Sequence, residues 1–336
     1  MGRRQADDHR NPGARQAQTL STAGRWAEQV WDLLRPQGKP DFPAGLAAGV
    51  LIVVPLLAGA ALHRTSLGAA VTLAATLMLY PAPQPLSLVM LVRGAAVTAA
   101  GVFVWLVAGQ PWLLAAGVTA AAVAGSFWPL LGTTAALGAL LMAIMDDPGI
   151  GVPGLAQLAG AAWAALVVLP LGRLSATVPP SELSLARRAR HAARLGVLVA
   201  VSMSITVLLG LRVAEGHWLV TAILVTLRPT PEATGSRYVK RMLGGLAGSA
   251  LAALILLCRP STLVTALCVG AAGTLAHAYR AANYVYWSFW MPVTVLLLAD
   301  FSYPEPWTAS VARLAMNLAG GLAALAAVRY LWPDPP

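Results

Sequence analysis

Basic side chains gather where one apolar segment ends, and their spacing suits the binding of an anion. The polar stretch from Arg228 to Arg241 contains Arg237 and Lys240 as well. On a helix, residues four apart share one face, so Arg237 and Arg241 would stack with Lys240 alongside. A guanidinium presents a planar fork of donors that matches a carboxylate. These three side chains are therefore candidates for binding an organic anion, and the alternative is a basic loop that only marks the cytoplasmic side of a membrane.

Prolines interrupt the chain at two corresponding places. Pro229 and Pro231 follow one short apolar segment, and Pro81, Pro83 and Pro85 follow another. Proline removes a backbone donor and leaves a carbonyl unpaired. A membrane protein accepts such backbone only beside protein or a water-filled cavity. Short, proline-interrupted segments at matching positions therefore predict a transport site between them.

Three charged residues stand next to apolar segments. Arg313 has apolar residues on both sides and is expected to face a helix bundle or a cavity, where it could bind an anion or pair with Asp300. Snorkelling to the outer surface is the alternative for Arg313. Asp147 and Asp300 each end an apolar segment, and they could relay protons in coupled transport or simply be exposed span ends.

Other chemistry is not indicated. The sequence contains no phosphate-binding loop, no dinucleotide glycine pattern, no metal-ligand spacing and no Ser-His-Asp arrangement in a plausible context. We therefore expect no enzyme activity, no cofactor and no metal. Trp218 is predicted to be an interfacial anchor. The aromatic residues at 284–290 are expected to serve packing and lipid contact, and stacking on a ring-bearing substrate is the alternative.

The composition places these side chains in a membrane. The 336 residues are 58% hydrophobic and only 11% charged, whereas soluble domains carry about 25% charged residues. The net charge of +10 would suggest nucleic acid in a soluble protein, but residues 94–145 contain no Asp, Glu, Lys or Arg. Basic residues confined to loops between apolar blocks are typical of membrane spans, so lipids and not nucleic acid are the expected partners.

Hydropathy predicts an all-α polytopic protein of about twelve transmembrane helices in two tandem six-helix repeats. A polar tail at 1–40, in which residues 21–36 form an amphipathic helix or a plain linker, precedes a first repeat at 41–174. A linker at 175–192 leads to the second repeat at 193–332. The predicted spans are 43–63, 66–80, 86–108, 111–129, 131–146, 154–173, 193–211, 216–228, 239–258, 261–279, 283–300 and 306–331.

A nearly constant offset supports the duplication. Arg93 precedes Arg241 by 148 residues, and both open a span. Asp147 precedes Asp300 by 153 residues at the ends of the fifth spans. Parallel repeats follow from six spans per half, and Arg93 becomes a binding candidate beside Arg241.

The basic residues also predict the orientation. With both termini in the cytoplasm, 19 Lys and Arg lie inside and 4 lie outside. This excess predicts an inner-membrane protein with cytoplasmic termini.

The second half resembles the fusaric acid resistance family of aromatic acid exporters. The resemblance rests on Gly216-His217-Trp218, on Thr221 and on the Arg-Pro, Thr and Arg positions of 228–241, followed by the GxxxG of Gly244 and Gly248. It adds Thr234 to the candidate residues and implies export of aromatic or other organic carboxylates. Gly245 replaces the threonine usual in that family. The GxxxG spacing itself predicts close packing of two helices.

Together these features predict a secondary transporter that exports organic anions, plausibly aromatic acids, driven by protons. Its substrate would be a small organic anion, and a homo-oligomer is left open. A passive organic-anion channel and a non-transporting membrane scaffold are the alternatives.

Overall fold

The computed structural model describes residues 31–32, 34–81, 85–144, 152, 154–172, 183–210, 213–302 and 307–333. Asp147 and most of the predicted amphipathic segment at 21–36 lie outside these residues. Within the described part, all regular structure is helical. The first six complete helices are α2 (Phe42–Ala61), α3 (Thr65–Met78), α4 (Leu86–Leu106), α5 (Pro111–Phe127), α6 (Thr134–Ile144) and α7 (Leu155–Leu171). The next six are α8 (Leu185–Leu208), α9 (Val213–Thr226), α10 (Pro231–Leu257), α11 (Thr262–Tyr279), α12 (Tyr284–Ser302) and α13 (Trp307–Tyr330).

The chain is a multi-pass membrane protein by the length and composition of its helices. Among the described residues, seven helices are long and apolar enough to cross a bilayer, namely α2, α4, α8, α10, α11, α12 and α13. The other five helices are apolar but shorter. A helix such as α3, with 14 residues, rises only about 21 Å, against about 30 Å of hydrocarbon. The count of twelve spans therefore stays a prediction.

Two helices begin before the apolar spans that were predicted from the sequence. Helix α8 begins at Leu185 and helix α10 at Pro231, about two turns before the predicted spans. Both extra stretches are polar, so hydropathy misses them, but each opens with a side-chain cap. The Ser184 hydroxyl accepts a bond from the Arg187 amide, and the Thr230 hydroxyl accepts one from the Ala233 amide.

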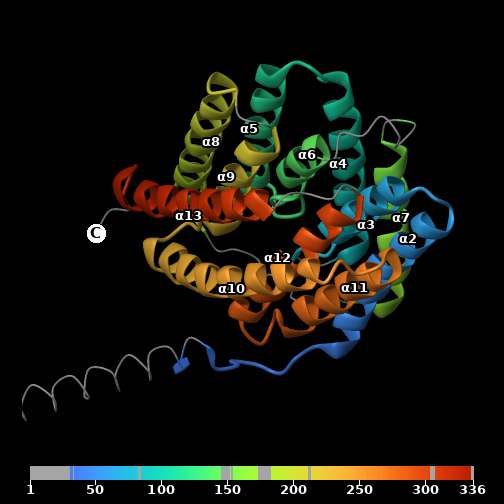
Figure 1. The fold of residues 1–336 in the computed structure, drawn as a ribbon. Helices are drawn as coiled ribbons and strands as arrows, with labels where there is room; N and C mark the ends of the chain where they lie inside the picture. The colour runs from blue at the N-terminus through green and yellow to red at the C-terminus, as the bar shows by residue number, and fades with distance from the viewer. Residues whose placement is uncertain are drawn as a thin grey trace, which may run out of the picture.

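Helices that are far apart in the sequence pack side by side. Helix α11 lies against α2, and α5 lies against α8 (Figure 1). Each of these pairs joins a helix of the first six to one of the last six. The two halves of the chain are therefore interlocked and do not form two separate bundles.

The packing of the first six helices recurs among the last six. In the first half, α2 contacts α3, α3 contacts α7 and α4 contacts α6. In the second half, α8 contacts α9, α9 contacts α13 and α10 contacts α12 in the same order. Two contacts between the halves, called the crossed pairs, are equivalent as well, because α5 against α8 corresponds to α11 against α2. Helices α3 and α9, the short proline-ended segments, consequently occupy equivalent positions in the packing.

The GxxxG segment of α10 packs closely on α12, as predicted. A Cβ atom at Gly244 would lie 2.6 Å from the Val285 carbonyl oxygen, and one at Gly248 would overlap the Phe289 carbonyl oxygen. A Cβ atom at Gly245 would meet nothing within 4 Å. Glycine at 244 and 248 therefore sets the distance between the two helix backbones.

Gly248→Ala is expected to destabilise the protein by about 1–3 kcal/mol, because a methyl group cannot enter without separating α10 from α12. Gly245→Ala is the matched control and should stabilise by about 0.5–1 kcal/mol, since alanine is the better helix former. Thermal melts of the purified variants in one detergent measure both changes. Equal melting temperatures for the two variants would contradict this account of the helix contact.

Candidate functional site

A cavity of about 130 Å³ lies between the two halves of the chain. It is lined by α3 and α6 from the first half and by α9, α10, α12 and α13 from the second. This volume holds about ten waters. The residues in its wall that carry polar or aromatic groups are Thr76, Tyr80, Trp218, Thr221, Arg241, Ser249, Trp287, Ser288, Thr294, Arg313 and Asn317. Aliphatic residues and methionines make up most of the remaining wall, and no described Asp or Glu lines it.

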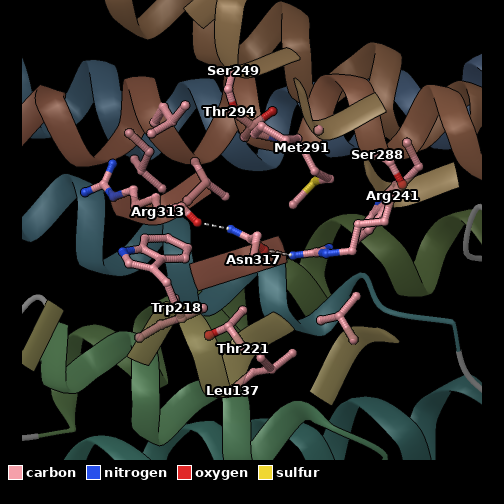
Figure 2. A pocket seen from close by; sticks show the side chains of 18 of the residues that line it. Leu137, Trp218, Thr221, Arg241, Ser249, Ser288, Met291, Thr294, Arg313 and Asn317 are labelled. Atoms are coloured by element: carbon pink, nitrogen blue, oxygen red, sulfur yellow. Dashed lines mark hydrogen bonds between the residues drawn. The ribbon is translucent and has the colours of Figure 1, made fainter. Parts of the chain in front are cut away.

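Two arginines on different helices meet through one asparagine in this wall (Figure 2). The Arg241 Nη2 atom donates to Asn317 Oδ1 at 2.7 Å. The Asn317 Nδ2 atom in turn donates to the Arg313 carbonyl oxygen at 2.8 Å, one turn earlier on α13. The Arg313 guanidinium carbon lies 4.9 Å from the centre of the Trp218 ring. Two cations and an indole ring therefore face one apolar cavity.

Several polar atoms in the wall are buried without a hydrogen-bond partner among the described residues. Four of them are Arg241 Nε, Trp218 Nε1, Trp287 Nε1 and Thr221 Oγ1, and Ser288 Oγ is a fifth. Three of these five are N–H donors that cannot accept a bond. Buried polar groups are nearly always paired, so each exception asks for an explanation. A wall of unpaired donors is suited to a ligand that brings acceptors.

Arg93 closes the end of α3 and does not line the cavity. Its side chain, 1% exposed, donates to the carbonyl oxygens of Tyr80 at 2.6 Å, Pro81 at 2.9 Å, Leu130 at 3.0 Å and Met78 at 3.4 Å. Helix ends leave carbonyls unpaired, and a cation beside them also balances the helix dipole. The structure thus places Arg93 as a cap for a helix that stops at a proline.

Arginines bind the end of α9 in a similar way. The Arg237 Nε atom donates to the Val225 carbonyl oxygen at 2.9 Å, and its guanidinium lies 3.8 Å from the centre of the Tyr284 ring. The Arg194 Nη1 atom donates to the Pro229 carbonyl oxygen at 3.1 Å. The proline-ended helices of both halves are therefore closed by guanidiniums from other helices.

Thr234 holds the turn between α9 and α10. Its hydroxyl donates to the Thr230 carbonyl oxygen at 2.8 Å and accepts a bond from the Arg228 amide at 3.0 Å. The side chain is fully buried and does not line the cavity. Lys240 is half-buried on α10 and also lies outside the cavity wall.

Aromatic rings and a further arginine meet where the two halves join at one end of the cavity. The Arg280 guanidinium lies 4.8 Å from the centre of the Trp287 ring and 5.1 Å from that of Tyr80. Desolvation lowers the pKa of Arg280 to about 10, and desolvation followed by the charge of Arg237 lowers that of Arg228 to about 9. Both groups stay protonated at neutral pH, so this end of the cavity is strongly positive.

The structure thus separates the predicted site residues into two groups. Arg241 and Arg313 come together in the cavity wall, whereas Arg93, Arg237 and Thr234 lie around the ends of α3 and α9. Asp300 is half-buried near the end of α12 and does not line the cavity. Roles for these residues in substrate binding and proton coupling stay predictions.

Sequence reasoning missed several residues of the cavity wall. Trp218 is 8% exposed and packs below Arg313, so its prediction as an interfacial anchor was wrong. Trp287 also lines the cavity, and its aromatic stretch was expected to serve packing and lipid contact rather than the alternative of substrate stacking. Asn317 follows Arg313 by one turn in an apolar helix, and that spacing is the signal that could have found it.

Comparisons with known proteins find a family match in the second half of the chain and three relatives that match part of it. Residues 198–327 match the family described as fusaric acid resistance protein-like, as the resemblance predicted. An uncharacterized protein from Neisseria gonorrhoeae is 30% identical over 145 residues, which are 43% of this chain and 34% of that protein. Inner membrane protein YccS of Escherichia coli and an uncharacterized protein of Haemophilus influenzae are each 28% identical over 43% of this chain and 20% of their own length. No solved structure matches the chain.

Proposed function

We propose that the protein is a secondary transporter of organic anions, because residues 198–327 match the family described as fusaric acid resistance protein-like. It exports aromatic carboxylic acids across the bacterial inner membrane. The Escherichia coli relative is an inner membrane protein by its name, which supports the location. The chain spans between 20% and 34% of the length of these relatives, so the proposed activity is argued from the site of this chain.

The chemistry of the cavity carries the proposal. Arg241 and Arg313 supply positive charge in an apolar enclosure, and none of the described residues that line it is an Asp or a Glu. A carboxylate bound there would form charge-assisted hydrogen bonds, which are about twice as strong as neutral ones. Trp218 and Trp287 offer ring faces to an aromatic body. Ligand sites commonly combine apolar walls with a few well-placed polar groups in this way.

The packing supports a route for the substrate. The positive end around Arg228, Arg237 and Arg280 raises the local concentration of anions and faces the cytoplasm in the orientation with both termini inside. The recurring helix contacts support two tandem repeats, and the cavity at their interface is the site that alternating access exposes to either side. The proton gradient drives export, with Asp147, Asp300 or Arg313 in the coupling.

Uptake of labelled 4-hydroxybenzoate into inverted membrane vesicles tests the proposal. We expect accumulation only in vesicles that contain the protein and only when a proton gradient is imposed. Vesicles made from cells without the protein are the control. Flux that follows the anion gradient and ignores protons would indicate a channel. Absence of flux for a panel of aromatic and aliphatic carboxylates would contradict transport and favour a scaffold.

A further inference from the structure

We infer that the Asn317 amide occupies the carboxylate position of Arg241 in the substrate-free protein and leaves it when substrate binds. This inference rests on the proposed function, because it assigns the anion-binding group of that same cavity. Asn317 becomes the residue that sets affinity, and Arg241 the residue that holds the carboxylate.

The unused donor of Arg241 is the first observation. In a guanidinium, the Nε and Nη2 hydrogens point to the same side and form one of its two-pronged edges. Asn317 Oδ1 takes only the Nη2 hydrogen of Arg241, and the buried Nε atom has no partner among the described residues. An amide offers one oxygen to this edge, whereas a carboxylate offers two parallel acceptors. The edge is therefore half-filled by Asn317 and would be filled by an organic acid.

The second observation is the hydrogen bond that fixes the Asn317 amide to its own helix. Its Nδ2 atom bonds to the Arg313 carbonyl on its own helix, so this bond can persist when the amide oxygen releases Arg241. Because a guanidinium can only donate, the oxygen and not the nitrogen of the amide must face Arg241. The amide is a neutral, single acceptor between two cationic side chains (Figure 2). A charged acceptor competes well against it.

Two substitutions of Asn317 test whether its amide only occupies the substrate position at Arg241 or is needed to hold the structure of the site. Asn317→Ala removes the competing acceptor and should tighten the dissociation constant of 4-hydroxybenzoate about fivefold, the effect of one ordinary hydrogen bond. Asn317→Asp places a tethered carboxylate on Arg241 and should weaken binding at least tenfold. Calorimetry on the purified full chain in detergent measures both. A purely structural Asn317 would lose affinity in both variants, and that result would overturn the inference.

Thermal unfolding without ligand keeps the test independent of the substrate. Both variants lack the Nδ2 donor, so Asn317→Ala is the baseline for Asn317→Asp. We expect Asn317→Asp to melt at least about 2 °C above Asn317→Ala, since the aspartate fills both prongs of Arg241. The double variant Arg241→Ala/Asn317→Asp should lose this gain.

Binding and thermal unfolding together distinguish failure of the proposed substrate from failure of the inference about Asn317. Wild-type protein that binds no 4-hydroxybenzoate would count against the proposed substrate, and a higher melting point for Asn317→Asp would still support a carboxylate site at Arg241. An Asn317→Asp variant that melts at or below Asn317→Ala would overturn the inference whatever the wild type binds.

Discussion

Arg241→Ala is expected to reduce gradient-driven accumulation of 4-hydroxybenzoate in inverted vesicles at least tenfold. Arg241 brings a guanidinium to the cavity wall, and its edge is only half used by Asn317. Hydrogen bonds to charged groups contribute about 1.5–3 kcal/mol each, which is about tenfold to hundredfold in affinity. Initial rates of uptake at several substrate concentrations would show the loss as a raised half-saturation concentration.

Arg329→Ala is the matched control for Arg241→Ala. Arg329 is an exposed arginine near the end of α13 and does not line the cavity, so the same change of charge should leave uptake within about twofold. Arg241→Lys should give an intermediate rate, because an ammonium keeps the charge but loses the fork. Wild-type uptake by Arg241→Ala would place the anion site elsewhere in the protein.

Arg93→Ala is expected to destabilise the protein by about 4 kcal/mol or more. The change leaves the carbonyl oxygens of Met78, Tyr80, Pro81 and Leu130 without the guanidinium that now bonds them. Each buried unsatisfied acceptor costs about 1–3 kcal/mol. A lowered melting temperature and a lower yield of folded protein in detergent would measure this effect.

Two further variants show whether Arg93 also binds substrate. Arg93→Lys keeps the charge with a single nitrogen and should recover only part of the stability. Arg64→Ala, at an exposed position before α3, should melt with the wild type. If Arg93→Ala melted normally but lost uptake, the cap would be incidental and the substrate role predicted from the sequence would gain support.

Arg93 and Arg241 show that the acceptors an arginine meets could not be predicted from the sequence. Both open a span at the same offset, so they were predicted to share one role. In the structure, Arg93 points toward the end of α3 and Arg241 toward the cavity. A guanidinium can satisfy helix carbonyls or a carboxylate equally well. Spacing along one helix shows which face a side chain is on, but the neighbouring helix decides which acceptors it meets.

The helices, their membrane character and the places where they are broken could be predicted from the order of residues alone. Those properties depend on local features, such as long apolar runs, prolines and the GxxxG of Gly244 and Gly248, which packs on α12 as predicted. The polar first turns of α8 and α10 were not predicted, because hydropathy detects only apolar residues.

Which residues form the site depends on tertiary packing. The crossed pairs of α11 with α2 and α5 with α8 interlock the two halves, and the cavity lies between α3 and α6 of one half and four helices of the other. Packing of α13 against α9 and α10 buries Trp218 beside Arg313 and brings Asn317 to Arg241. The physical reason is that periodicity reports which side of a helix is buried, whereas the partner that covers this side comes from a distant part of the chain.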